Sequence, residues 1–313
     1  MRTSIPPRQT PREGVLRFVM LLVAAFALAG CHPGNQEAKR LHRACETGEV
    51  ASCNRLAIRL QQGQYVLKDD GRAGDLFARA CRGGVGDGCA SLGVMHHLGT
   101  GVARDSARAS TLLRQGCDAG SMDGCARLGV LYREGAGTPK DVVKAATLFR
   151  RACDAGQQLA CAHLGALHVA GEGVGQDVAR AVALLQRSCT GKVALGCGEL
   201  GSLHAAGNGV PRNDSTAAAL FKQACDGDDV VGCFRLGAAY EAGSGVTQNY
   251  ERSAELYREA CEDRHGESCY RLAGLYEKGA GVSRQTRRAV TFTRRACAYG
   301  HAPACPAKPK AAS

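Results

Sequence analysis

Tryptophan is absent from this 313-residue sequence, and aromatic residues together make up only 5% of it. The shortage of bulky rings disfavours a core built around large side chains. Alanine is frequent and glycine occurs 41 times, a composition that suits small, closely packed helices. Long apolar stretches are scarce as well, because the most apolar run covers only residues 18–28 and is short for a membrane span.

The signatures of several enzyme and metal-binding classes are also missing. No serine has a lysine three positions later, as a serine β-lactamase requires, and no Gly-x-Ser-x-Gly, His-Glu-x-x-His or P-loop pattern occurs. The histidines are scattered, and no cysteine pair has the C-x₂₋₄-C spacing typical of zinc sites. The sequence therefore predicts no catalytic residue, no metal and no cofactor.

Cysteine, by contrast, is abundant and regularly placed. Sixteen of the 17 cysteines form pairs eight positions apart, and successive pairs are 36 residues apart without an insertion. The pairs are Cys45/Cys53, Cys81/Cys89, Cys117/Cys125, Cys153/Cys161, Cys189/Cys197, Cys225/Cys233, Cys261/Cys269 and Cys297/Cys305. An even, paired set of this size favours an oxidising compartment.

The spacing within each pair constrains the backbone. On one straight helix, eight residues would separate the two Cα atoms by about 12 Å, whereas a disulfide needs them within roughly 7 Å. A pair can therefore bridge only if the chain reverses between its members. Segments such as Asp118–Ser121 have the residues of a turn. We expect a helix to end at the first cysteine and another to start at the second.

A fixed 36-residue period predicts a solenoid, in which each unit packs only against its neighbours. Seven units begin at Cys53 and at every 36th residue after it, and a helical half-repeat, residues 38–47, precedes them. Each unit carries leucine three positions after its first cysteine, glycine or alanine next, and glycine at position ten. Asp or Asn follows at the start of a second helix in six units. We expect helices of about ten and fourteen residues around a glycine loop.

The amino-terminal residues 1–30 have the features of an export signal, namely a basic stretch followed by the short apolar run. The segment Leu28-Ala29-Gly30-Cys31 resembles the lipobox of bacterial lipoproteins, which implies cleavage before Cys31 and lipid on its thiol. An ordinary secreted protein with a chance cysteine is the alternative. His32 follows in place of the aspartate that retains lipoproteins at the inner membrane of enteric bacteria, which favours the outer membrane. Residues 31–37 are then a lipidated linker, 38–305 the solenoid and 306–313 a disordered tail.

The run Cys125–Gly137, followed by Asp141, Ala145, Phe149 and Cys153, resembles a Sel1-like repeat. More narrowly, it is similar to the cysteine-rich Sel1-like proteins first described in Helicobacter. The resemblance covers residues 38–305 and implies an all-α, right-handed α/α solenoid of seven repeats with one disulfide per repeat. It also implies roles in protein interaction, although members of that subgroup are often labelled β-lactamases. Tyr65, which replaces a loop glycine in the first unit, is a local departure.

The resulting hypothesis is a monomeric, lipid-anchored scaffold that binds a protein or peptide in the cell envelope and does not bind nucleic acid. A β-lactamase-like hydrolase acting on a β-lactam or peptidoglycan precursor is the alternative. Solenoids present extended concave surfaces, and residues of the first helices are expected to line one here. The candidates are Arg127, Tyr132, His168, His204, Arg235, Tyr240 and Tyr276. Aromatic packing inside each unit is the competing interpretation of the His/Tyr column.

Overall fold

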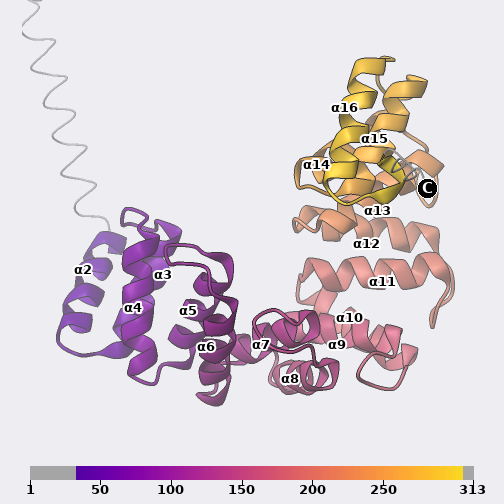
Figure 1. The fold of residues 1–313 in the computed structure, drawn as a ribbon. Coiled ribbons are helices and arrows are strands. Elements are labelled where there is room, and N and C mark those ends of the chain that lie inside the picture. Colours follow the sequence, from indigo (N-terminus) through magenta and orange to yellow (C-terminus); the bar gives the residue numbers. More distant parts are fainter. Residues whose placement is uncertain (1–32, 306–313) are drawn as a thin grey trace, which may run out of the picture. The chain divides into compact units, whose positions relative to one another are not determined.

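The structure is a computed structural model that describes residues 33–305, and every regular element in this range is helical (Figure 1). Fourteen of its helices form seven units of two helices each, preceded by α2 (Pro33–Glu46) and followed by the short 3-10 helix η1 (Ala302–Ala304). The all-α solenoid with seven two-helix units that the sequence predicts is confirmed.

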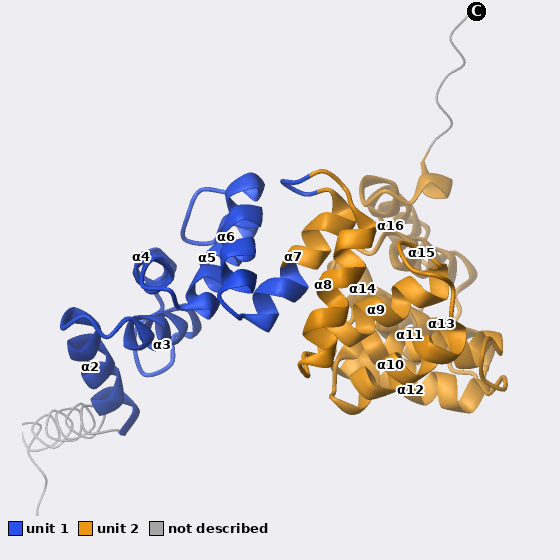
Figure 2. Cartoon of the chain, turned by 90° about the horizontal axis from the view of Figure 1, so that it is seen from below, with its two compact units in different colours: residues 1–127, 136–138 blue, residues 128–135, 139–313 orange. Residues whose placement is uncertain are grey.

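The first helices of the units are α3 (Val50–Gln62), α5 (Gly86–Leu98), α7 (Met122–Glu134), α9 (Gln158–Ala170), α11 (Ala194–Ala206), α13 (Val230–Ala242) and α15 (Gly266–Lys278). The second helices are α4 (Asp70–Arg82), α6 (Ser106–Asp118), α8 (Val142–Asp154), α10 (Val178–Thr190), α12 (Asp214–Asp226), α14 (Tyr250–Glu262) and α16 (Thr286–Ala298). The chain also divides into two compact parts, which Figure 2 labels unit 1 and unit 2. The first part consists of the chain up to residue 127 together with residues 136–138, and the second consists of residues 128–135 and the chain from 139 onward.

The helix that precedes the repeats starts earlier than the sequence predicts. Residues 33–37, expected to be a linker, belong to α2, which begins at Pro33 rather than near Ala38. Proline suits the first position of a helix because its missing N–H has no partner there in any case. Ala38, Leu41 and Cys45 then form the buried stripe of α2 at three- and four-residue spacing.

The turns between units are also tighter than expected. All helices of the seven units have 13 residues, where helices of ten and fourteen were predicted. Helix α6 ends one residue after Cys117, and α7 begins three residues before Cys125. The intervening turn is closed by the Ser121 N–H, which donates to the Gly116 carbonyl, with Gly120 at a positive φ of 91°. Each cysteine of this pair therefore lies just inside a helix end.

The prediction that each first helix starts at its cysteine was therefore wrong. Cys89, Cys197 and Cys269 are the fourth residues of α5, α11 and α15, not the first. The physical reason is that each of their N–H groups already donates to the carbonyl four residues earlier, at 3.2 Å in all three cases, as within a helix. The same displacement by three residues applies to Cys53, Cys125, Cys161 and Cys233.

The loop within each unit has two fixed points. Glycine ends the first helix in the left-handed conformation, as Gly99 does with φ 75°. The residue that caps the second helix donates its N–H to a carbonyl near the end of the first helix, as from Asp105 to His96 at 2.8 Å. The Asp105 carboxylate in turn accepts the Arg108 N–H at 2.9 Å. The same side-chain cap occurs at Asp69, Asp141, Asp177, Asn213 and Asn249, which confirms that prediction.

The second helix of the last repeat, α16, lacks this cap. Gln285 occupies the capping position, and its side chain makes no cap hydrogen bond. We expect Gln285→Asp to raise the free energy of unfolding by about 1 kcal/mol, since aspartate can accept the free N–H groups of the first turn. Chemical denaturation followed by circular dichroism measures the change. The matched change Asp177→Ala should lower stability by a similar amount, and equal stability of all three proteins would contradict the capping argument.

The core explains the repeated leucine and glycine. The seven leucines of that column are buried, and the most exposed of them, Leu200, is only 6% exposed. The next residue faces the second helix so closely that a Cβ on Gly129 would lie 2.7 Å from the Phe149 ring, and one on Gly165 would lie 2.8 Å from Leu185. Glycine weakens a helix by about 1 kcal/mol, and close packing of the two helices offsets that cost.

Candidate functional site

The turns between units are locked by disulfides. All eight cysteine pairs have bonded sulfurs and Cα–Cα distances of 4.4 to 4.8 Å. One disulfide per repeat, implied by the family resemblance, is confirmed. Their number indicates an oxidising compartment outside the cytoplasm. The bridges are Cys45–Cys53, Cys81–Cys89, Cys117–Cys125, Cys153–Cys161, Cys189–Cys197, Cys225–Cys233, Cys261–Cys269 and Cys297–Cys305.

The second cysteine of each bridge within the array is part of the core. Cys89, Cys197 and Cys269 are 3%, 2% and 0% exposed. Their burial follows from their place inside the first helix, where Cys197 and Cys269 are bonded to the preceding second helix and pack with Ala224 and Ala296 of the following one. These sulfurs hold the fold together, and they offer no surface to a ligand.

Within residues 33–305, one group of side chains has the spacing of metal ligands, namely Cys225, Cys233 and Glu259. Its two sulfurs are bonded to each other. A metal-bound cysteine is a thiolate, so this group does not have the chemistry of a metal site in the oxidised protein.

The His/Tyr column predicted as part of a binding surface lies mostly inside the units. His168 is 5% exposed, and its Nδ1 lies 3.1 Å from the Gly175 carbonyl of its own loop. A carbonyl can only accept, so Nδ1 carries the proton. His96 makes the same bond to the Ala103 carbonyl at 3.0 Å. These histidines fasten the loop to the first helix.

The tyrosines of the column also pack internally. Tyr132 is 8% exposed, and Tyr276 is 2% exposed with its ring stacked on Phe292 at 5.6 Å between ring centres. The Tyr276 hydroxyl accepts a hydrogen bond from the Arg288 guanidinium at 3.1 Å. Tyr240 and His204 are half-buried. The side chains of this column therefore pack mainly inside their own repeats. Tyr240 and His204 are its more exposed members.

The two arginines among the candidates are accessible. Arg127 is 43% exposed along its side chain and pairs with Asp123 at 2.5 Å. Arg235 is 30% exposed, donates to the Gly198 carbonyl at 3.1 Å and lies 3.6 Å from Glu199. Their position in the repeat, two residues after the first cysteine, is shared by two further arginines. These residues, which sequence reasoning missed although they follow the same Arg-Leu-small pattern, are Arg55 and Arg271.

His163 occupies this position in its own repeat and is almost buried. Its ring stacks on Phe149 at 4.9 Å, and Nδ1 lies 3.3 Å from the Arg133 guanidinium. Burial, reinforced by the charge of Arg133, lowers the pKa of His163 to about 4. The imidazole is therefore neutral near pH 7, and its nitrogen can accept the hydrogen bond from Arg133.

The second compact part of the chain (orange in Figure 2) contains a small groove beside Arg235. Helices α11, α12 and α13 enclose a cavity of about 280 Å³. Alanines form much of its wall, Phe221 closes one side, and Arg235 and Asp214 supply the charges. The Arg235 guanidinium carbon lies 5.9 Å from the centre of the Phe221 ring. The groove combines a narrow apolar wall with one cation and one anion.

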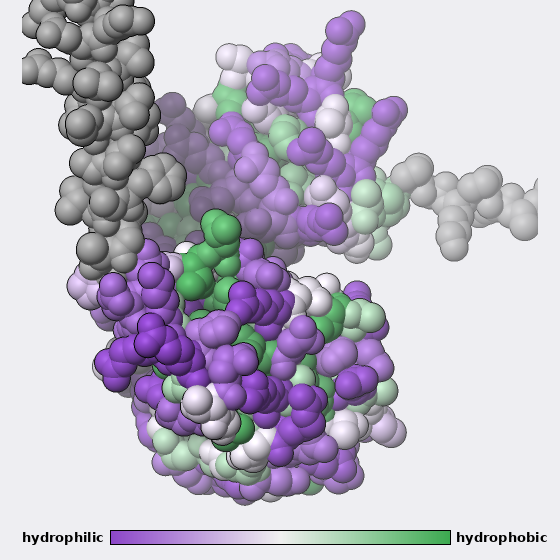
Figure 3. All heavy atoms as spheres, turned by 90° about the vertical axis from the view of Figure 1, so that its left-hand side faces the viewer, coloured by the Kyte–Doolittle hydropathy of each residue, from purple (hydrophilic) through white to green (hydrophobic). Residues whose placement is uncertain are grey.

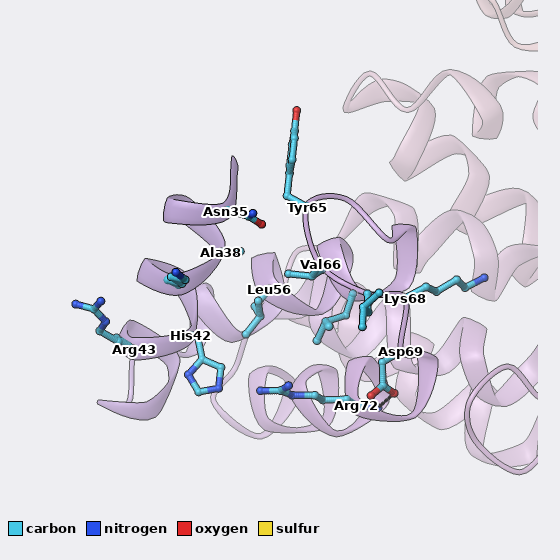
Figure 4. A pocket seen from close by; sticks show the side chains of 13 residues that line it. Asn35, Ala38, His42, Arg43, Leu56, Tyr65, Val66, Lys68, Asp69 and Arg72 are labelled. Atoms are coloured by element: carbon cyan, nitrogen blue, oxygen red, sulfur yellow. Dashed lines mark hydrogen bonds between the residues drawn. The ribbon is translucent and has the colours of Figure 1, made fainter. Parts of the chain in front are cut away.

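The first compact part of the chain contains a larger cavity of about 720 Å³. It is bounded by α2, the end of α3, the loop 63–69 and the start of α4 (Figure 4). Leu56, Leu60 and Val66 supply apolar lining. His42 and Arg72 extend toward each other across one side (Figure 4). This cavity could not be predicted from the sequence, because a cavity between α2 and the first repeat has no counterpart in the repeat pattern.

The predicted export signal, the lipid-bearing Cys31 and the predicted tail 306–313 lie outside the described residues. In the part of the chain that the structure describes, none of the helices has both the length and the apolar character required to cross a bilayer.

Pairs of short helices joined by glycine loops and disulfide-locked turns define a cysteine-rich helical repeat protein. The Sel1 repeat family matches the segments 50–85, 86–121, 123–157, 158–192, 194–229, 230–265 and 266–301. The chain therefore belongs to the Sel1 repeat family. No curated protein matches the sequence.

Three solved structures illustrate the similarity. The protective antigen c5321 of uropathogenic Escherichia coli, which displays the same repeat fold, is 27% identical with a TM-score of 0.61, and the match covers 85% of this chain and 57% of that one. A Sel1 repeat protein from Oxalobacter formigenes is 22% identical with a TM-score of 0.61, covering 85% and 77%. The cysteine-rich protein B of Helicobacter pylori is 25% identical with a TM-score of 0.34, covering 42% and 93%.

Proposed function

We propose that this protein is a lipid-anchored scaffold of the bacterial cell envelope that binds an extended segment of a partner protein. The alanine-lined groove beside Arg235 is the observation that carries the proposal. Its narrow apolar wall suits a small apolar side chain, and Arg235 suits a neighbouring carboxylate on the same peptide. Disulfides at every turn limit the movement of the helices and so reduce the ordering cost of binding.

Site-specific photo-crosslinking in cells tests the groove. Ala242 lies at the groove and is exposed, so a photoreactive phenylalanine there should form an adduct with the partner on irradiation. The additional change Arg235→Glu should remove the adduct by repelling the partner's carboxylate. Val143, 63% exposed on α8, is the control position and should give no such adduct. Adducts of equal yield from both positions, or insensitivity to Arg235→Glu, would disprove binding at this groove.

The membrane attachment is proposed from the lipobox-like segment that ends at Cys31. The odd number of cysteines supports it, since the other sixteen are used in disulfides. Cys31→Ser should remove the mass of the lipid and weaken the retention of the protein in the membrane fraction. An intact mass that differs only by the exchange of sulfur for oxygen would show that Cys31 carries no lipid.

A further inference from the structure

The loop of the first repeat differs from the other six in both chemistry and packing. In the other repeats, a glycine follows the helix-ending glycine by two positions and lies against the start of the preceding second helix. A Cβ on Gly101, for example, would lie 2.4 Å from the Asp70 carbonyl oxygen. In the first repeat the residue is Tyr65, at a positive φ of 59°.

The helix before the first repeat is α2. The start of α2 leaves space for the Tyr65 ring. Tyr65 lies against Gly34, where a Cβ would come within 2.3 Å of the Tyr65 ring. The Tyr65 side chain lies beside the start of α2 and points away from the cavity (Figure 4). Gly34 is three positions after Cys31, the proposed site of the lipid. Tyr65 therefore contacts a residue that is three positions along the chain from the proposed point of attachment.

This loop exposes apolar side chains. Leu67 is 91% exposed and Tyr65 is 50% exposed. The residues that correspond to Leu67 in the other repeats are all smaller: Ala103, Pro139, Gly175, Pro211, Thr247 and Ser283. In the space-filling view from the side of α2, hydrophobic atoms protrude among hydrophilic ones (Figure 3). An apolar residue at the tip of a loop can insert into a lipid bilayer. In a groove that binds a peptide, by contrast, the apolar residues lie at the bottom of the groove.

Positive charge surrounds this loop. Lys39, Arg43 and Arg72 line the neighbouring cavity and are exposed, and none of them has an ion pair among residues 33–305. Asp69, the acidic residue of the lining, already accepts the Arg72 N–H as the cap of α4. The three basic side chains are therefore available to contact phosphate groups.

We propose that the loop Tyr65–Lys68 and the basic residues Lys39, Arg43 and Arg72 form a docking surface for an anionic phospholipid bilayer. Leu67 and Tyr65 enter the interface and the three cations contact lipid phosphates. The surface acts as a second membrane signal beside the lipid on Cys31, and it refines the location on which the proposed function rests.

Co-sedimentation with vesicles tests this surface without the lipid. The chain from residue 31 onward, carrying Cys31→Ser and lacking the proposed signal 1–30, is mixed with vesicles of phosphatidylcholine, with or without phosphatidylglycerol. It should bind only the anionic vesicles, and binding should weaken with added salt. Failure to bind anionic vesicles would overturn the docking surface. It would leave both the lipidation of Cys31 and the groove beside Arg235 standing, because intact mass and crosslinking measure those separately.

Two variants identify the surface. Tyr65→Gly with Leu67→Ser gives this loop the residues found at Gly281 and Ser283 in the last repeat, so folding is preserved, and binding should fall about tenfold. Lys39→Gln, Arg43→Gln and Arg72→Gln together should reduce binding roughly a hundredfold, at about fivefold per residue. Circular dichroism checks that both variants keep their helices.

A matched control makes the same change of net charge elsewhere. Arg284→Gln, Arg287→Gln and Arg294→Gln remove three exposed arginines in and just before α16, and binding to anionic vesicles should change less than about twofold. An equal loss in this control would show nonspecific attraction and overturn the proposal. Binding of acidic peptides without binding of vesicles would assign the surface to a protein partner, and would overturn it as well.

Discussion

Reduction of the disulfides is expected to abolish most of the helical structure. Each bridge closes a loop of nine residues, which stabilises the folded chain by roughly 2–3 kcal/mol in the chain-entropy model. Eight bridges together amount to roughly 20 kcal/mol, more than the net stability of about 5–15 kcal/mol typical of folded proteins. Isolated helices of 13 residues are marginal in water, so the reduced units depend on packing between neighbouring helices alone.

The loss should proceed unit by unit, because the repeats of a solenoid interact mainly with their neighbours. Cys305 is exposed at the last bridge, whereas Cys153 and Cys161 are both 0% exposed. The terminal bridge should therefore be reduced first and the central one late. Mass spectrometry of alkylated cysteines over time gives the order.

Thermal melts followed by circular dichroism give the size of the effect. The oxidised protein without reductant is the control, and the double change Cys153→Ala/Cys161→Ala isolates one buried bridge at a cost of roughly 2–3 kcal/mol. Identical melting with and without a strong reductant would mean that packing alone holds the helices, and the entropic argument would fail.

The repeat architecture was predictable because seven copies make each column visible. The cysteine spacing requires a chain reversal whatever else the sequence contains, and the cap residues Asp105 and Asp177 mark the starts of second helices. The starts of first helices were predicted three residues late, at cysteines such as Cys89. The residue before a first helix varies: Val85 and Val193 make no side-chain cap, whereas Ser121 and Asp229 do, so the repeat has no constant capping residue that marks those ends.

The candidate surface was only partly predictable, since a column shows that a position matters without showing what covers it. His168 and Tyr132 were predicted as surface residues, yet both are buried, and His168 is bonded to the loop of its own repeat. Leu60, the apolar member of the same column in the first unit, was the available clue. The cavity at α2 departs from the repeat, and its one visible trace was the pair of substitutions at Tyr65 and Leu67.

The second loop glycine offers the sharpest test of how neighbouring repeats fit together. A Cβ on Gly245 would lie 2.0 Å from the Asp214 carbonyl oxygen at the start of α12. Its φ of 71° is also unfavourable for other residues. We expect Gly245→Ala to lower the free energy of unfolding by about 3 kcal/mol or more, because backbone must move away from backbone in addition to the strain.

Gly156 separates the two causes, because its φ is 97° and nothing lies within 4 Å of a Cβ built there. Gly156→Ala should cost only about 1–2 kcal/mol, the strain of a left-handed alanine. Urea denaturation of both variants beside the wild type measures the difference. Equal losses would mean that the backbone conformation alone requires glycine at position 245. A clearly larger loss for Gly245→Ala would show that contact between successive repeats requires it, and would explain why only the first repeat, which has α2 before it, can carry a tyrosine there.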